Sequence, residues 1–353
     1  MKAVMHTELG NADVLRVTEL AVPEPGAGEV RVRVAVSGVN PTDWKGRSGT
    51  YGAGEIPLSV PNQDGAGVID AVGPGADGGS AVGDGATGAP LAVGDRVWIT
   101  LAAYQRPASG TAQEYTTVPA SRVFPLADEA TFELGASIGI PAITAHRALT
   151  VAEDGPSRLA PGALDGRTVL IAGGAGAVGH AAIQLARWAG ATVITTVSGP
   201  AKAAAAQSAG AQHVVNYRDE DAAEQIRAIA PDGVELIVEV AAGANNALDL
   251  AVLAPRGTIA IYANDGDTPF ALEVRENMGL NARYQFVLLY SVGWNKLAAG
   301  AEDVNAAIAD GALPVGEAAG LPLVEFPLEQ TDDAHRAVES GAVGKVLVKV
   351  AEL

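Results

Sequence analysis

The sequence predicts an α/β protein of two domains, in which a β-rich first domain precedes a domain built on a doubly wound parallel sheet. The chain has 353 residues, more than one hydrophobic core comfortably fills. Short strand-like segments separated by turns occupy the first third, and no long helix interrupts them. After residue 166, strand-like and helix-like segments alternate, which is typical of a parallel sheet covered by helices.

Composition and charge narrow the class of protein. Hydrophobic residues make up 48% of the chain and charged residues 18%, which is typical of a folded protein. The net charge of -18 would repel nucleic-acid phosphates and acidic membranes, so neither is expected as a partner. The chain has no cysteine, which excludes disulfides, thiolate metal sites and cysteine nucleophiles. No export segment or membrane span is evident, and we expect a cytoplasmic protein.

The first domain begins as antiparallel β structure. From Glu29 to Val36 every second residue is a valine, the two-residue period of a half-buried strand. Further strands are predicted at 67–72, 95–100 and 113–118, between clusters of turn residues. The run from Gly73 to Gly94 is rich in Gly, Ala and Asp and has almost no large apolar residues, so it is predicted to be a surface loop.

The second domain is predicted from alternating elements. A helix is expected over 132–149, then a buried strand at 168–172, a helix with apolar residues between 178 and 189, and a strand at 192–197. Later strands are expected at 234–240 and 257–262, with helices starting near residues 200, 219 and 245. Beyond residue 279 the alternation weakens, and a helix at 331–340 precedes a strand at 345–350 that could rejoin the first domain.

A glycine-rich segment carries the strongest functional signal. Gly173, Gly176 and Gly179, with Ala177 and Val178 between the last two, lie between a predicted strand and a predicted helix. Glycines let the backbone turn sharply and approach a pyrophosphate, whose charge the N-terminus of the next helix stabilises. An ordinary flexible turn is the alternative, but the two flanking elements favour a dinucleotide site.

The residues after the second strand indicate which dinucleotide binds. NAD-binding folds often place an acidic residue there for the ribose hydroxyls, yet no Asp or Glu occurs between residues 191 and 218. Ser198, Lys202 and Tyr217 can instead donate hydrogen bonds or positive charge to a 2′-phosphate, although Lys202 could equally be a solvated lysine. The sequence therefore predicts NADPH.

Four residues follow the later predicted strands. They are Val240, Ala241, Tyr262 and Asn264. Because open α/β sheets bind ligands beyond the carboxyl ends of their strands, we expect these residues to contact the cofactor.

At this point the sequence resembles a known superfamily. The segment AGGAGAVGHAAIQLARWAGATVITTVSG, with GVNPTDWKGRSGTY (38–51) and VPNQDGAGVIDAVG (60–73), resembles the medium-chain dehydrogenases/reductases, and the zinc-free quinone oxidoreductase (zeta-crystallin-like) branch fits best. The resemblance covers nearly the whole chain. It implies a GroES-like catalytic domain formed by residues 1–135 and 281–353, a Rossmann domain over 136–280 that binds the cofactor in the cleft, and a homodimer.

The resemblance also indicates whether the protein binds zinc. Zinc-dependent members have a Cys in the segment that here reads 38–43, and Gly-His-Glu where this chain has Asn62, Gln63 and Asp64. Zinc needs three or four well-placed Cys, His or carboxylate ligands, and Asn40 with Gln63 would be weak substitutes. The five histidines are scattered without ligand spacing, so they are expected at surface or packing positions. We predict no metal.

Without a Lewis acid, hydride addition to a conjugated acceptor is favoured over simple alcohol oxidation. Asn40 resembles the family's asparagine near the nicotinamide. Tyr51, eleven residues later, resembles the tyrosine that donates a proton in enoyl-thioester reductases, but could merely pack against substrate. Asp43 and Trp44 are expected to shape the pocket. Lys345 resembles a family position near the cofactor cleft, or could be an exposed lysine at a strand edge.

These residues predict an NADPH-dependent oxidoreductase that transfers hydride to a quinone or similar conjugated acceptor without zinc. Two alternatives stay open. One is a 2-enoyl or enone reductase, which delivers the same hydride to another conjugated electrophile. The other is an NADPH-binding protein without turnover.

Overall fold

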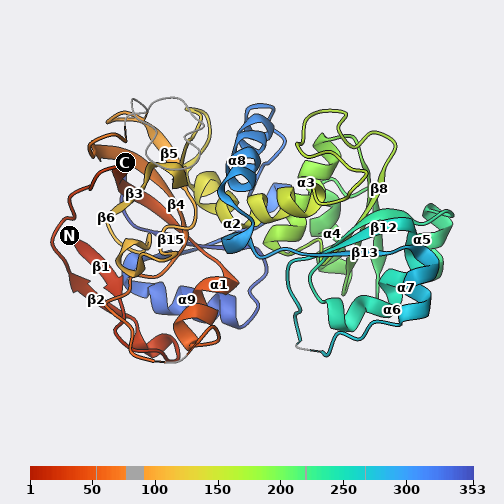
Figure 1. Ribbon diagram of the computed structural model, residues 1–353. Helices are drawn as coiled ribbons and strands as arrows, with labels where there is room; N and C mark the ends of the chain where they lie inside the picture. Colours follow the sequence, from red (N-terminus) through yellow and green to blue (C-terminus); the bar gives the residue numbers. More distant parts are fainter. Residues whose placement is uncertain (53, 77–90, 219–220, 267) are drawn as a thin grey trace. The chain divides into compact units, whose positions relative to one another are not determined.

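The computed structural model describes residues 1–52, 54–76, 91–218, 221–266 and 268–353 (Figure 1). The chain forms two compact units, one of Met1–Ile140 with Leu323–Leu353 and one of Pro141–Pro322. Most of the surface loop predicted between Gly73 and Gly94 lies outside the described residues. Within the described part of the chain, no helix is long and apolar enough to cross a membrane.

The first unit is β-rich, as predicted. A two-stranded antiparallel sheet pairs β1 (Lys2–Met5) with β2 (Arg16–Glu19). The larger sheet has seven strands in the order β14-β15-β3-β4-β5-β7, with β6 also paired to β3. Its strands are β3 (Glu29–Val39), β4 (Asp64–Val72), β5 (Arg96–Ile99), β6 (Tyr115–Pro119), β7 (Val123–Pro125), β14 (Leu323–Pro327) and β15 (Lys345–Lys349).

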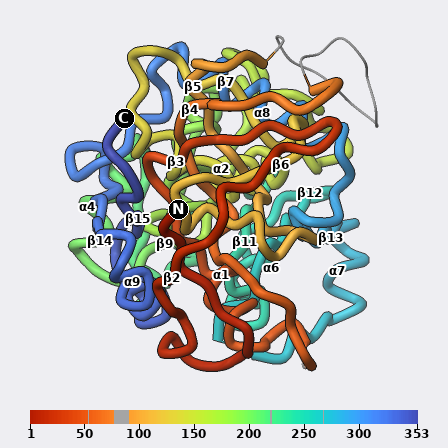
Figure 2. Tube along the Cα trace, turned by 90° about the vertical axis from the view of Figure 1, so that its left-hand side faces the viewer, coloured from red at the N-terminus to blue at the C-terminus, as the bar shows by residue number. Residues whose placement is uncertain are grey.

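Both ends of the chain contribute to this sheet. The alternating valines of β3 are buried at positions 30, 32 and 34, which confirms the two-residue pattern. Near its end β3 pairs antiparallel with β15, where Val39 lies opposite Val346. In Figure 2 the blue strand β15 accordingly lies beside β3. The prediction that the last strand rejoins the first domain is confirmed.

Two helices of this unit, α1 (Pro41–Ser48) and α9 (Thr331–Glu339), pack against each other. The pattern of 331–340 predicts α9, but α1 was not predicted because its eight residues have no apolar period. Local chemistry explains α1 instead. The backbone N–H of Asn40 donates to Asp43 at 2.7 Å, Pro41 opens the first turn, and Gly49 ends the helix in the left-handed conformation at φ 89°.

The second unit is a doubly wound parallel sheet of six strands. They are β8 (Thr168–Ala172), β9 (Thr192–Val197), β10 (His213–Asn216), β11 (Val234–Glu239), β12 (Leu253–Ile261) and β13 (Arg283–Phe286). Their spatial order is β10-β9-β8-β11-β12-β13, so the first strand of the unit lies beside the fourth. This is the strand order of dinucleotide-binding sheets, which bind ligands where the order reverses, between β8 and β11.

The helices of the second unit are α3 (Ala177–Trp188), α4 (Pro200–Ser208), α5 (Ala222–Ile229), α6 (Ala242–Val252), α7 (Val274–Leu280) and α8 (Trp294–Ala309), while α2 (Phe132–Leu149) contains the boundary between the units. Residues 281–322 belong to this unit, whereas the sequence placed the return to the first domain at 281. The reason is α8. Its Asp303 accepts hydrogen bonds from His146 at 2.7 Å and from Arg158 at 2.6 and 2.8 Å.

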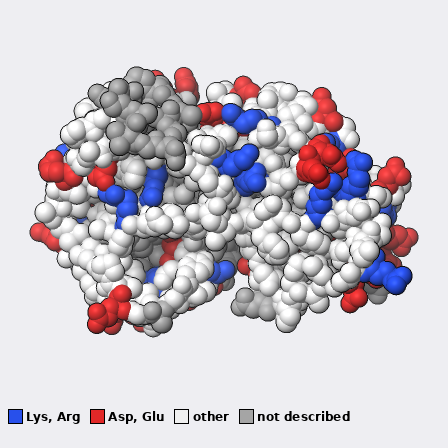
Figure 3. Space-filling view, viewed as in Figure 1, with Lys and Arg blue, Asp and Glu red and all other residues white. Residues whose placement is uncertain are grey.

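Charge is dispersed over the described part of one face of the molecule. On the face drawn in Figure 3, Lys and Arg side chains occur in small separate groups among acidic ones. Among the described atoms of this face they form no continuous basic stripe. This face therefore offers no extended surface for phosphate backbones.

Candidate active site

The glycine-rich turn joins β8 to α3, as predicted, and its glycines meet different steric demands. Gly173 has φ 68°, a conformation that favours glycine. A Cβ on Gly174 would lie 2.2 Å from Thr195 Oγ1, and a Cβ on Gly179 would lie 2.4 Å from the carbonyl oxygen of Gly173. Gly176 is different. It has an ordinary φ of -80°, and the nearest atom to an added Cβ is 3.5 Å away.

The first turn of α3 follows Gly176. His180 donates its backbone N–H to the Gly176 carbonyl at 2.7 Å, so the helix is hydrogen-bonded from its start. The N–H groups of Ala177, Val178 and Gly179 precede that bond, and the first N–H groups of a helix have no acceptor within the helix. They form a partial positive charge at the carboxyl edge of the sheet, where an anion is stabilised.

The residues predicted to bind a 2′-phosphate lie just beyond the ends of the neighbouring strands β9 and β10. Val197 pairs with Asn216 in the β9–β10 register, so Ser198 and Tyr217 each follow the last paired residue of neighbouring strands. The backbone N–H of Tyr217 donates to the Val197 carbonyl at 3.1 Å, and its side chain is 48% exposed. Lys202 is exposed in the first turn of α4. These positions leave all three side chains accessible.

The loops after β11 and β12 also meet. Ala241 forms an isolated bridge with Asn264, and Asn264 Oδ1 accepts the backbone N–H of Gly243 at 2.8 Å. Val240 lies against the glycine turn, because a Cβ on Gly173 would be 3.2 Å from its Cγ1. The backbone N–H of Tyr262 donates to the backbone carbonyl of Glu239 at 3.0 Å. The four residues predicted from strand ends thus lie at one edge of the sheet.

Two buried acids beneath these loops were missed. Glu239 ends β11 and accepts hydrogen bonds from the Ala241 N–H and from Asn245 Nδ2, the latter at 2.9 Å. Burial raises the pKa of Glu239, and burial together with the charge of Glu239 raises the pKa of Asp249 well above its usual range. Both shifts favour the protonated form of these carboxyls. The only signal in the sequence was that Glu239 is an acidic residue within a run of apolar strand residues.

In the first unit, Asn40 belongs to a buried polar cluster. Lys345 Nζ donates to Asn40 Oδ1 at 2.7 Å and to the Val39 carbonyl at 3.2 Å. Asn40 Nδ2 donates to Asp64 Oδ2 at 2.6 Å, and Lys345 Nζ lies 3.9 Å from the same oxygen. Lys345 is 1% exposed and Asp64 fully buried. The alternative that Lys345 is an exposed lysine at a strand edge is therefore wrong.

Asp64 is held from several sides. Thr100 Oγ1 donates to it at 3.2 Å, and the backbone N–H of Ile140 lies 2.9 Å from both carboxylate oxygens. The close approach of α2 depends on Gly139, where a Cβ would lie 2.2 Å from Asp64 Oδ1. Burial raises the pKa of Asp64, and the charge of Lys345 opposes that shift. Burial likewise lowers the pKa of Lys345, and the charge of Asp64 opposes it.

Asp43 and Gln63 complete the cluster. Asp43 accepts the backbone N–H of Gln63 at 3.1 Å in addition to that of Asn40. Burial raises the pKa of Asp43 to about 8, and the nearby charge of Asp64 adds to the shift. Gln63 Oε1 is buried without a hydrogen-bond partner among the described residues. Asp43 therefore supports the backbone at Asn40 and Gln63, and Gln63 keeps an acceptor without a partner among the described residues.

Tyr51 follows α1 and is 67% exposed, whereas Asn40 is 3% exposed. The ring of Trp44 lies within the same helix, with the Lys45 ammonium 5.7 Å from its centroid. The phenol of Tyr51 is free to meet a ligand.

Buried histidines form hydrogen bonds within the fold. His180 Nε2 lies 2.8 Å from the Ala319 carbonyl, and His335 Nε2 lies 2.9 Å from Asn62 Oδ1. Burial lowers the pKa of His335 to about 3. Among the residues that the structure describes, no three His, Cys, Asp or Glu form a metal-binding group.

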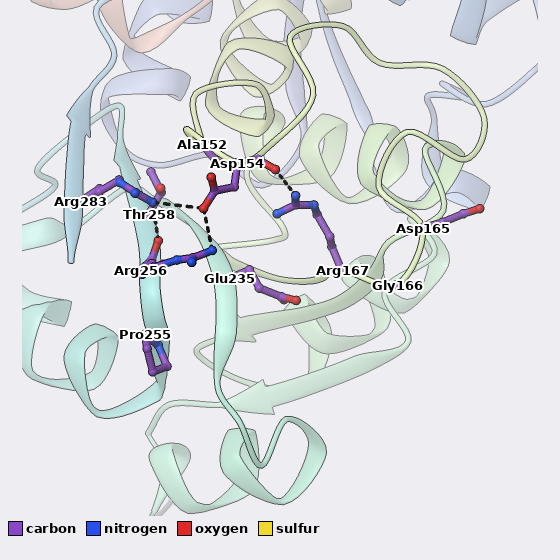
Figure 4. Close-up of a pocket in the computed structure, with 11 residues that line it drawn as sticks. Ala152, Asp154, Asp165, Gly166, Arg167, Glu235, Pro255, Arg256, Thr258 and Arg283 are labelled. Atoms are coloured by element: carbon purple, nitrogen blue, oxygen red, sulfur yellow. Dashed lines mark hydrogen bonds and ion pairs between the residues drawn. The ribbon is translucent and has the colours of Figure 1, made fainter. Parts of the chain in front are cut away.

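A separate hollow of about 360 Å³ lies where β8, β11 and β12 begin (Figure 4). Arg167, Arg256 and Arg283 line it, and Asp154 already pairs with Arg256 at 3.0 Å and Arg283 at 3.7 Å. Figure 4 shows Asp154 between those two arginines. Since doubly wound sheets bind ligands at the opposite, carboxyl edge, this hollow is not the candidate site.

Comparisons with known proteins cover most of the chain. The family model for zinc-binding dehydrogenases matches residues 177–304, and that for the alcohol dehydrogenase GroES-like domain matches 26–128. The quinone oxidoreductases of Homo sapiens and Lama guanicoe are each 30% identical over 354 residues, covering 99% of this chain and 97% of the relative.

Comparison with solved structures gives similar relatives. A mycobacterial quinone oxidoreductase is 30% identical, with a TM-score of 0.81 and 99% of each chain covered. A mycobacterial protein solved in complex with NADPH is 29% identical, with a TM-score of 0.79, covering 99% of this chain and all of the other.

Proposed function

The chain belongs to the quinone oxidoreductase branch of the medium-chain dehydrogenase/reductase superfamily, and from this premise we propose that it transfers hydride from NADPH to a quinone or similar conjugated acceptor without zinc. One observation carries the proposal. The glycine turn lies in the second unit where the strand order reverses, and the packing of the protein itself does not require a glycine at Gly176.

NADPH is supported by three accessible donors and by the absence of an acid after β9. Ser198, Lys202 and Tyr217 lie beyond neighbouring strands, and the mycobacterial relative was solved with NADPH. Lys202 has no carboxylate within ion-pair distance among the described residues, so its charge is available to a phosphate. Gly176, Ala177, Val178 and Gly179 would hold the pyrophosphate, and residues 240–241 and 262–264 would contact the rest of the cofactor.

Replacing Lys202 by Ala is expected to weaken NADPH binding roughly tenfold or more, because a charge-assisted contact to phosphate is worth about 1.5–3 kcal/mol. NADH affinity should be nearly unchanged. Titration of both cofactors by fluorescence measures the two dissociation constants. An equal loss for NADPH and NADH would contradict a contact with the 2′-phosphate.

The residues at the metal-binding positions of zinc-dependent relatives do not fit zinc. Asn40 Oδ1 already accepts a hydrogen bond from the Lys345 ammonium at 2.7 Å, and Gln63 supplies only an amide. A buried ammonium at this place would repel a divalent cation. No step of the proposed reaction therefore passes through a metal.

We accordingly expect full activity after exhaustive dialysis against a chelator. Metal analysis of the dialysed protein and its turnover number measure this directly. Stoichiometric zinc whose removal abolishes turnover would refute it.

The reaction needs a hydride donor, an oriented acceptor and a stabiliser of the charge that develops on it. Bound NADPH supplies the hydride. In the first unit, Asn40 carries a side-chain amide within the buried polar cluster, and Tyr51 carries an exposed phenol. Because Tyr51 lies eleven residues after Asn40, as in enoyl-thioester reductases, reduction of enones is the second candidate activity.

Multiple-turnover oxidation of NADPH with a panel of quinones and enones tests the proposal. Turnover of at least one acceptor class is expected. An NADPH-binding protein without catalysis would bind the cofactor and oxidise none of it.

We further propose a homodimer that forms through the open edge of the second sheet. β13 is the last strand of that sheet, and Phe286 on β13 is 63% exposed, while Val274 and Met278 on α7 are 68% and 71% exposed. Light scattering should give twice the chain mass of 35.6 kDa, and a mass of one chain would contradict the dimer. A cytoplasmic location stays a prediction from the sequence.

A further inference from the structure

Two acidic side chains are buried at the carboxyl edge of the second sheet. Glu239, the last residue of β11, is fully buried, and Asp249 on α6 is 2% exposed. Asn245 and Asp249 lie four residues apart, so one side of α6 brings both to Glu239. Both acids belong to the second unit, and no part of the first unit enters this cluster.

The two carboxyls can bond to each other only through a proton. Glu239 Oε1 accepts N–H groups of Ala241 and Asn245, whereas Oε2 is buried and, with both acids ionised, has no donor among the described residues. A hydrogen bond nevertheless joins the side chains of Glu239 and Asp249. Ionised carboxyls accept but cannot donate, so this bond requires that one of the two is protonated.

The surroundings assign the proton to Asp249. Backbone N–H groups of Val240 and Ala241 stabilise the charged form of Glu239. Burial and the charge of Glu239 raise the pKa of Asp249 well above its usual range. Asp249 is therefore the acid and Glu239 the carboxylate, and the two titrate as one pair.

Neither acid forms an ion pair with a Lys, Arg or His among the described residues. On α5, Arg227 donates instead to backbone carbonyls at the end of α6. The other titratable groups here are Tyr262 after β12, with Asp265 near it, and Tyr284 on β13; burial raises the pKa of both tyrosines, and the charge of the pair adds to the shift. Without the shared proton, two like charges would face each other in buried surroundings.

We propose that Glu239 and Asp249 share one proton at neutral pH, and that this proton positions Val240 and Ala241 to bind NADPH. The inference rests on the proposed function, in which those two residues contact the cofactor. Each acid acts through that segment and is therefore a positioning residue. When the proton leaves, repulsion separates the two carboxylates and withdraws Glu239 from the N–H groups that it holds. NADPH affinity then falls as the pH rises.

Calorimetric titration of NADPH at about pH 7 and about pH 9.5, where ordinary Asp and Glu stay ionised and Lys stays charged, tests this in the parent and in Asp249→Asn. The Asn side chain matches Asp in size, and its N–H donates to Glu239 at every pH. One proton linked to binding changes the dissociation constant by up to about tenfold per pH unit. The rise in the constant between the two pH values should therefore be about tenfold or more larger in the parent than in Asp249→Asn.

Asp232→Asn is the matched control, because it removes an exposed acid just before β11 and should keep the parent's pH dependence. If Asp249 only fills its buried position, Asp249→Asn changes the constant by one factor at every pH and keeps the parent's dependence, which would overturn the proposal. Glu239→Gln is the second variant, in case Asp249→Asn does not fold. Its amide donates to the Asp249 carboxylate, so it should remove the pH dependence as well.

A second readout needs no cofactor. The infrared difference spectrum between the parent and Asp249→Asn at neutral pH should contain the carbonyl stretch of one protonated carboxyl. The melting temperature of the unliganded parent should also fall more steeply with rising pH than that of Asp249→Asn, because the native parent keeps a proton that the unfolded chain has lost.

Absence of the infrared band would overturn the shared proton. A band without the pH effect on affinity would overturn the positioning role. If the parent binds no NADPH at any pH, the proposed function and the positioning role fail together, while the band still decides whether the two acids share a proton.

Discussion

Replacing Tyr51 by Phe is expected to lower enone reduction by roughly two decades or more, while two-electron quinone reduction and NADPH affinity change much less. Hydride arriving at the β-carbon leaves an enolate, and a positioned proton donor typically contributes about 10²–10⁴-fold to such a step. The Tyr51 side chain is exposed, and its phenol O–H can donate to a ligand. A quinone accepts both electrons without a dedicated donor.

Steady-state rates of one enone and one quinone in the parent and in Tyr51→Phe measure this selectivity. Tyr115→Phe is the matched control, because it removes a phenol on β6 and should leave both rates unchanged. Enone turnover at the parent's rate in Tyr51→Phe would mean that Tyr51 only packs against substrate and that solvent protonates the enolate.

Replacing Gly176 by Val is expected to weaken NADPH binding about a hundredfold, which corresponds to losing two charge-assisted hydrogen bonds of about 1.5 kcal/mol each. The protein itself does not require glycine at this position, since φ is ordinary and an added Cβ meets no atom closer than 3.5 Å. The space beside Gly176 is therefore kept for a ligand that approaches the backbone. The unliganded fold should lose less than about 1 kcal/mol, the usual cost of a poorer N-cap.

The control is Gly174→Ala, whose Cβ would lie 2.2 Å from Thr195 Oγ1. That variant should lower the melting temperature of the unliganded protein, because overpacking costs about 1–3 kcal/mol. Calorimetry of both variants, with and without NADPH, separates the two effects. A Gly176→Val protein that binds NADPH like the parent would show that no cofactor backbone contact occurs there.

The elements that could be predicted are those whose sequence pattern lies within a single strand, helix or turn. The valine alternation of β3, the helix over 132–149 and the glycine turn each follow from residues close in sequence. The carboxyl-edge positions of Ser198, Val240 and Asn264 could also be predicted, because they follow from strand ends alone.

Features that depend on distant residues could not be predicted. Lys345 is buried because β15 pairs with β3, which brings it to Asn40 across 305 residues of sequence. Its segment alone is equally compatible with an exposed edge strand. Helix α8 escaped detection because its alanines give little contrast between faces, although its packing sets the end of the second unit.

The central claim is direct hydride transfer from NADPH to a conjugated acceptor without a metal. The most direct test follows the label from NADPH deuterated at either C4 position into the product of an enone, with the protein dialysed against a chelator. The account predicts turnover with deuterium at the β-carbon from one of the two labelled cofactors and a slower rate for that cofactor. Turnover that requires added zinc, or product without deuterium from either cofactor, would contradict it.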